Sequence, residues 1–178
     1  VHLWLISSLT FALAANAGDV VPGGAIIVNG DAFTPANLAK AGYAASPLED
    51  GSLSGFGVFV IPISTLNAGA LAGLDMTAKQ IDLTKNFFAL GVMFWLFERS
   101  MDPTLRWIEE KFGKRPVVAE ANRRALQAGY AFGETTDIIT IDRAEPLRDH
   151  PRAVAAELYG GIGATLDVLT DGTAGLES

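Results

Sequence analysis

The sequence has no cysteine, and its only histidines are His2 and His150. Without thiols the chain cannot form a disulfide, bind zinc through thiolates or hold an iron–sulfur cluster, so any such cluster would belong to a partner. Two histidines far apart in sequence make a His-based metal site or a Ser-His-Asp triad hard to build. We therefore expect no metal site, and the common hydrolytic enzymes are disfavoured.

Positive charge and long hydrophobic runs are also scarce. The chain carries 13 basic and 20 acidic residues, a formal net charge of −7, which argues against binding to the phosphates of a nucleic acid. The most apolar stretch, residues 87–97, is well short of the ~20 residues that span a bilayer. Nucleic acid and membrane are therefore not expected as partners.

The 178 residues are 49% hydrophobic and 19% charged, which predicts one domain with a sizeable core, plus a tail. A strand covered on both faces is indicated by residues 25–29, an apolar run without polar alternation. Residues 1–6 and 57–63 indicate two further apolar strands, the latter ending at an edge of the sheet because it contains Pro62. Strands of this kind alternating with helical segments favour an α/β fold. We expect a parallel sheet of about three strands with a C-terminal helical part.

The N-terminus allows two interpretations. Residues 1–6 followed by the Ala-rich residues 7–17 resemble a strand and a helix, but also the apolar part and cleavage site of a secretory signal. The basic segment that begins such signals is missing, and no initiator Met is present, so we favour a strand and helix in a chain truncated at its start. The alternative is a secreted or periplasmic α/β ligand-binding protein, for which mature-protein sequencing would find a start near Gly18.

Helix signals recur along the chain. Thr34 and Pro35 predict the start of a helix, and Ser64 and Thr65 can cap a weak one. Residues 75–83 look like a surface connection, and Gly133 should stop the last strong helix. The predicted helices cover residues 35–41, 64–74, 85–97, 103–112 and 116–132.

The predicted helix at residues 85–97 is apolar nearly all round. Phe87, Leu90 and Phe94 follow the helical period on one side, while Phe88, Val92 and Trp95 occupy the other. A domain of this size would struggle to cover both sides. We therefore expect one side to contact a partner subunit or a missing part of the same chain.

Two positions are candidates for ligand contact. Asn29, followed by Gly30 and Asp31, lies where a parallel strand ends, the edge at which α/β sheets bind ligands, although the three residues could simply form a turn. Lys85 and Asn86 begin the predicted apolar helix, where free backbone N–H groups could bind a carboxylate or CoA, although they could equally be a capping pair. We find no convergent acid, base and nucleophile, and expect no catalytic residue.

Three stretches resemble a known family. They are residues 26–34 (Ile-Ile-Val-Asn-Gly-Asp-Ala-Phe-Thr) with 37–43 (Asn-Leu-Ala-Lys-Ala-Gly-Tyr), residues 46–53 (Ser-Pro-Leu-Glu-Asp-Gly-Ser-Leu), and the block from Lys-Asn-Phe-Phe-Ala-Leu-Gly at 85–91 to Gly-Glu-Thr-Thr at 133–136. They resemble the gamma-type domain at the front of the alpha subunit of 2-oxoglutarate:ferredoxin oxidoreductases. The resemblance covers residues 1–137. Residues 138–178 do not match and are expected to be a linker and a divergent tail.

This resemblance implies a Rossmann-like α/β domain ahead of a thiamine-diphosphate domain, paired with a beta subunit in a cytoplasmic enzyme. Such enzymes convert a 2-oxoacid and CoA to acyl-CoA, carbon dioxide and reduced ferredoxin, using thiamine diphosphate, Mg²⁺ and an iron–sulfur cluster. The Gly-rich turn that opens the family's domain would precede Val1, and the Tyr-Pro-Ile-Thr-Pro signature of the thiamine domain is absent. The resemblance therefore implies a non-catalytic assembly domain, close to CoA, that binds no cofactor and has no activity alone.

Overall fold

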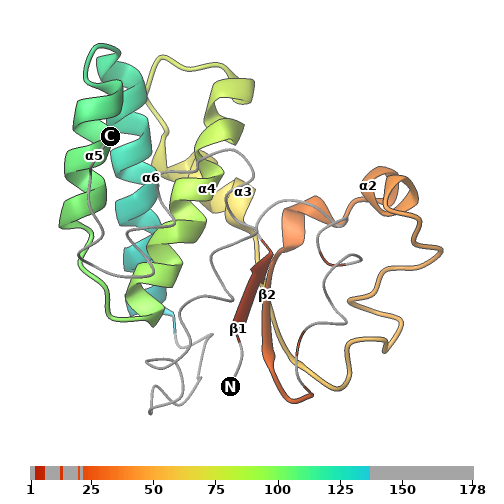
Figure 1. Ribbon diagram of the computed structural model, residues 1–178. Helices are drawn as coiled ribbons and strands as arrows, with labels where there is room; N and C mark the ends of the chain where they lie inside the picture. Colours follow the sequence, from red (N-terminus) through yellow and green to blue (C-terminus); the bar gives the residue numbers. More distant parts are fainter. Residues whose placement is uncertain (1–2, 7–12, 14–19, 21, 137–178) are drawn as a thin grey trace.

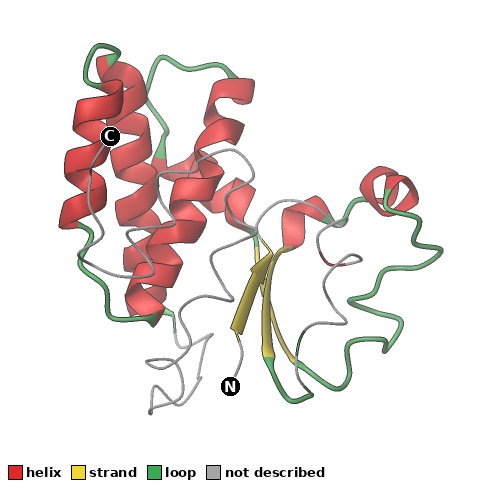
Figure 2. Cartoon of the chain, viewed as in Figure 1, coloured by secondary structure: helices red, strands yellow, loops and turns green. Residues whose placement is uncertain are grey.

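The computed structural model describes residues 3–6, 13, 20 and 22–136. Three strands and a 3-10 turn precede or alternate with five helices (Figures 1 and 2). The expected helix at 7–17, apart from Leu13, and the expected linker and tail at 138–178 lie outside the described residues. The elements are β1 (Leu3–Ile6), β2 (Ala25–Asn29), η2 (Gly30–Ala32), α2 (Pro35–Lys40), β3 (Gly57–Ile61), α3 (Ile63–Ala70), α4 (Ala78–Leu96), α5 (Asp102–Phe112) and α6 (Pro116–Thr135).

The described strands form one parallel sheet in the order β1-β2-β3. All five residues of β2 are buried, as expected for a strand covered on both faces. Ile27 belongs to the core that includes α4 and α6, whereas Ile26 and Val28 belong to a second core with Leu13. The expected α/β class, with a parallel sheet of three strands and a C-terminal helical part, is confirmed.

Helix α4 differs most from its predicted bounds. It begins at Ala78, where Thr77 and Gln80 form a reciprocal capping box, and not at Lys85. Residues 78–83 look like a connection in the sequence because half of them are polar, but polar residues are normal in the exposed first turns of a helix. Helix α3 is shorter than predicted and follows Pro62 directly, so Ser64 and Thr65 lie in its first turn and do not cap it.

The expectation that a partner covers one side of α4 is wrong. Residues 87–96 are all buried within this chain, because β2 and β3 contribute to the same core as Ile108 of α5 and Leu126 of α6. Figure 1 shows α4 among α3, α5 and α6, beside the sheet. An apolar helix is thus sheltered on both sides by a small domain. None of the described helices is long and apolar enough to cross a membrane.

Helix α6 also extends beyond its predicted end, continuing past Gly133 to Thr135. Gly133 does not stop the helix because it serves packing: a Cβ there would lie 2.5 Å from Cδ2 of Trp95. Its role is to let the indole of α4 rest against the helix backbone. The prediction that Gly133 ends this helix is therefore wrong.

Candidate interface at the carboxyl edge of the sheet

Asn29 joins the end of β2 to the start of α3. Its Oδ1 accepts hydrogen bonds from the backbone N–H groups of Ile63 at 3.1 Å and Asp31 at 3.2 Å. Its Nδ2 donates to Ser64 Oγ at 3.0 Å. The side chain is almost fully buried, so these bonds satisfy polar groups that water cannot reach. Asn29 therefore links the end of β2 to Ile63 and Ser64 of α3, which lie 34 and 35 residues away in the sequence.

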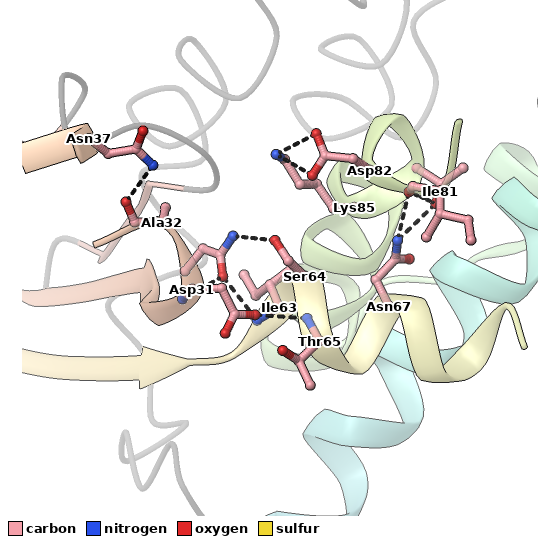
Figure 3. A network of polar contacts seen from close by, with 12 residues as sticks. Asp31, Ala32, Asn37, Ile63, Ser64, Thr65, Asn67, Ile81, Asp82 and Lys85 are labelled. Carbon is pink, nitrogen blue, oxygen red and sulfur yellow. Dashed lines mark hydrogen bonds and ion pairs between the residues drawn. The ribbon is translucent and has the colours of Figure 1, made fainter. Parts of the chain in front are cut away.

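Asp31 adds a second link at the same edge. Its Oδ2 accepts a hydrogen bond of 2.7 Å from the backbone N–H of Thr65, in the first turn of α3 (Figure 3). A carboxylate here is favoured by the partial positive charge at a helix N-terminus. The carboxylate of Asp31 thus accepts from a backbone N–H group to which an external anion could otherwise bind. Hydrogen bonds within the chain therefore join the carboxyl edge to α3. This agrees with the interpretation that residues 29–31 form a turn.

Lys85 and Asn86 do not lie at a helix start. They are about two turns inside α4, where backbone N–H groups are used by intrahelical bonds, so the argument from free N–H groups is wrong. The side chain of Lys85 pairs with Asp82 at 2.9 Å and keeps 20% of its surface exposed. Asn86 Oδ1 is buried and has no hydrogen-bond donor within the described part of the chain. Only their side chains are left for contacts beyond the domain.

Asn67, which sequence reasoning missed, ties α3 to α4. Its Nδ2 donates to Ile81 O at 3.0 Å and to Thr84 Oγ1 at 2.9 Å, while Thr84 Oγ1 donates to Ile81 O at 2.7 Å (Figure 3). The available signal was a lone Asn inside an apolar helical segment, where Asn is disfavoured unless its side chain has partners. Helix α3 is therefore bound by amide side chains to the sheet on one side and to α4 on the other.

The polar groups at the carboxyl edge hydrogen-bond to one another and hold α3 against the sheet. Its shared groups are amides, hydroxyls and one carboxylate that already accepts a backbone N–H, and none of them is paired as nucleophile and base. Across the residues that the structure describes, no three His, Asp or Glu side chains gather where they could hold a metal ion. Asn29 is joined to α3, and within the described residues none of its hydrogen bonds goes to Lys85 or Asn86.

A parallel sheet with helices packed on it and a polar carboxyl edge defines a Rossmann-like α/β domain. Residues 5–132 match the family model described as pyruvate ferredoxin/flavodoxin oxidoreductase, and the chain belongs to this family. It is 43% identical over 133 residues to the 2-oxoglutarate oxidoreductase subunit KorA of Mycobacterium tuberculosis. The match covers 75% of this chain but only 20% of that relative.

A shorter similarity connects the chain to a second group of enzymes. Over 44 residues it is 57% identical to a probable acetolactate synthase of Mycobacterium bovis and to the acetolactate synthase large subunit IlvG of M. tuberculosis. These matches cover 25% of this chain and 8% of each relative. No solved structure shows significant similarity to the chain. The comparisons favour an oxidoreductase subunit and do not favour the secreted binding protein.

Proposed function

We propose that this chain acts as a non-catalytic assembly domain of a thiamine-diphosphate-dependent 2-oxoacid:ferredoxin oxidoreductase. The observation that carries the proposal is the family match over residues 5–132, combined with a polar edge whose groups bind one another. The parent enzyme would convert a 2-oxoacid and CoA to acyl-CoA, carbon dioxide and reduced ferredoxin. The domain's contribution is to hold neighbouring subunits in place, and the chemistry occurs on them.

The same match supports the domain boundary that we propose. Residues 1–137 form the gamma-type domain, which includes all the described elements, and residues 138–178 form a linker and divergent tail. The partners are the thiamine-binding alpha domain and the beta subunit, in a cytoplasmic complex, with ferredoxin reached through that complex. The chain spans only a fifth of the length of its KorA relative, so these partners are part of the proposal.

We assign the cofactors to the partners because this chain lacks the side chains and the signature that would bind them. A chain without cysteine has no thiolate to hold an iron–sulfur cluster, so the cluster of the complex must be ligated by another subunit. Thiamine diphosphate and Mg²⁺ belong to the alpha domain, whose signature this sequence lacks. CoA is a substrate of the complex.

At the carboxyl edge we propose that Lys85 and Asn86 contact CoA or a neighbouring subunit through their side chains. The side chain of Lys85, which keeps 20% of its surface exposed, supports such a contact. Asn86 follows it, and its buried Oδ1 has no hydrogen-bond donor within the described residues. Asn29 contributes less directly, since its side chain is used in positioning α3. Its role at the interface is to fix the edge against which the contact forms.

Co-purification tests the proposal. The full chain, tagged and co-expressed with the thiamine-binding alpha domain and the beta subunit of its host's own 2-oxoglutarate oxidoreductase, should recover both, identified by mass spectrometry. The chain alone should not reduce a dye in the presence of a 2-oxoacid and CoA. Recovery of a folded monomer without either subunit would overturn the assembly role. Oxoacid-dependent dye reduction by the chain alone would overturn its non-catalytic character.

A further inference from the structure

One end of the helical layer exposes large apolar side chains. Leu83 in α4 is 69% exposed, and Val117 in the first turn of α6 is 42% exposed. Gly129 lies beside Phe88 and Gly133 beside Trp95, so α4 and α6 run in the same direction. The first turns of α4 and α6 therefore lie at the same end of the layer as the last turn of α5 (Figure 1).

Aromatic side chains connect these two exposed residues. Leu83 lies one turn before Phe87 on the same face of α4, and the Phe87 ring is 6.4 Å from the Trp107 ring. Trp107 in turn meets the edge of Phe112, with ring centroids 5.7 Å apart. Trp107 and Phe112 are only half-buried. We call Leu83, Trp107, Phe112 and Val117 the apolar stripe.

The apolar stripe has a basic rim in a chain whose net charge is −7. Lys79 precedes Leu83 by one helical turn. The last turn of α5 carries one further exposed cation and the α5–α6 turn two, one of which places its guanidinium 5.5 Å from the Phe112 ring. Glu110 is the acid on the same face of α5 as Trp107. In the described part of the chain none of the four rim cations forms an ion pair with a carboxylate. The rim consists of Lys79, Lys111, Lys114 and Arg115.

We propose that the apolar stripe and its basic rim form the docking surface for another subunit of the oxidoreductase, through an apolar patch ringed by carboxylates. Aromatic residues and arginine are enriched in protein interfaces, and charges of opposite sign around an apolar centre orient the partner. The stripe crosses the ends of three helices, whereas a helix that binds a membrane surface presents one long apolar face. This inference rests on the proposed function and names the surface through which it is carried out.

Two substitutions on the apolar stripe and its rim test the surface. Leu83→Asp places a charge on the most exposed apolar residue of the stripe, and Lys114→Glu reverses a charge on its rim. Each should weaken recovery of the co-expressed subunits about 10-fold or more, while circular dichroism and the unfolding midpoint of the chain stay unchanged, since both side chains are exposed. Lys40→Glu reverses an exposed charge in α2, away from the stripe (Figure 1), and is the matched control that should bind as the original chain does. Added salt should weaken binding of the original chain more than that of Lys114→Glu.

The outcomes separate the two proposals. If the original chain recovers no subunit, the assembly role itself fails. If the original chain recovers the subunits and both variants recover them equally well, only the docking surface is overturned. Vesicles of phosphatidylcholine and phosphatidylserine provide a third arm: binding to them that Lys114→Glu abolishes, with subunit recovery unaffected, would assign the surface to anionic lipid and overturn the protein partner.

Discussion

The carbonyl oxygen of Phe88 in α4 lies against the α-carbon of Gly129 in α6, with no room for a Cβ between them. Gly91 makes the reciprocal approach, since a Cβ there would lie 2.7 Å from Tyr130 N and closer still to Leu126 O. The two helices therefore pack backbone to backbone at their crossing. The bulky side chains of α4 are left to fill the core on either side of it.

Gly129→Ala should destabilise the chain by about 3 kcal/mol or more, because a methyl group would push two helix backbones apart in a packed core. The free energy of unfolding, measured by urea denaturation, checks this. Gly69→Ala in α3 is the control: no atom lies within 4 Å of its Cβ position, so it should be neutral or stabilise by up to about 1 kcal/mol. Equal midpoints for the two variants would contradict the close crossing.

Asn29→Ala should cost about 2–3 kcal/mol, because it leaves the buried N–H of Ile63 without an acceptor. Ser64→Ala removes only the Oγ acceptor of the same side chain and should cost about 1 kcal/mol. Hydrogen exchange at the Ile63 amide should accelerate in the first variant and change little in the second. Similar exchange in both would show that Asn29 does not hold the start of α3.

Phe94→Ala should lower the stability of the isolated chain by about 3–5 kcal/mol, since this ring is fully buried by the chain's own elements. Leu83→Ala removes an exposed side chain and should change stability by less than about 0.5 kcal/mol. Thermal unfolding of the purified chain without partners is the measurement. A small loss for Phe94→Ala would indicate that α4 is poorly covered until a subunit binds.

Glu120 should make stability depend on acid pH. Hydrogen bonds from Arg123, then from Arg124, hold the pKa of its carboxyl below the ordinary value of 4.5. Because the folded-state pKa of Glu120 is lowered, its ionised carboxylate contributes fully to the free energy of unfolding above the unfolded-state pKa. This contribution is lost as the pH falls through the folded-state pKa. Glu120→Gln should therefore destabilise the chain slightly at pH 7, by about 0.5 kcal/mol, and this difference should disappear as the pH falls through the folded-state pKa. A loss independent of pH would contradict this ion pair.

Local signals predicted several elements well. The bounds of β2 agree with prediction because a short apolar run between a Pro-Gly-Gly turn and an Asn-Gly turn has few alternatives. The cap of α2 agrees too, with Thr34 accepting the N–H of Asn37 at 3.3 Å. The start of α4 was missed because its first turns are polar, and the end of α6 because Gly133 has two physical meanings.

The candidate site was predicted only in part. Asn29 was singled out by its place after a strand, but its partners are 34 and 35 residues away, and no local pattern indicates which amide will accept which N–H. The position of Lys85 was misjudged together with the start of its helix. The link through Asn67 was not anticipated at all, because it depends on where α3 lies against α4.

By itself the sequence determined the element types, the parallel sheet, the lack of thiolate ligands and the family resemblance, since composition, periodicity and motif spacing are local properties. Only the tertiary structure decided that residues 87–96 of α4 are buried within the chain. It also decided that the apolar stripe, which includes Leu83 near the start of α4, remains exposed. The physical reason is that burial depends on which surfaces meet. Three glycines determine how closely α4 and α6 approach, and their role is apparent only once the helices are side by side.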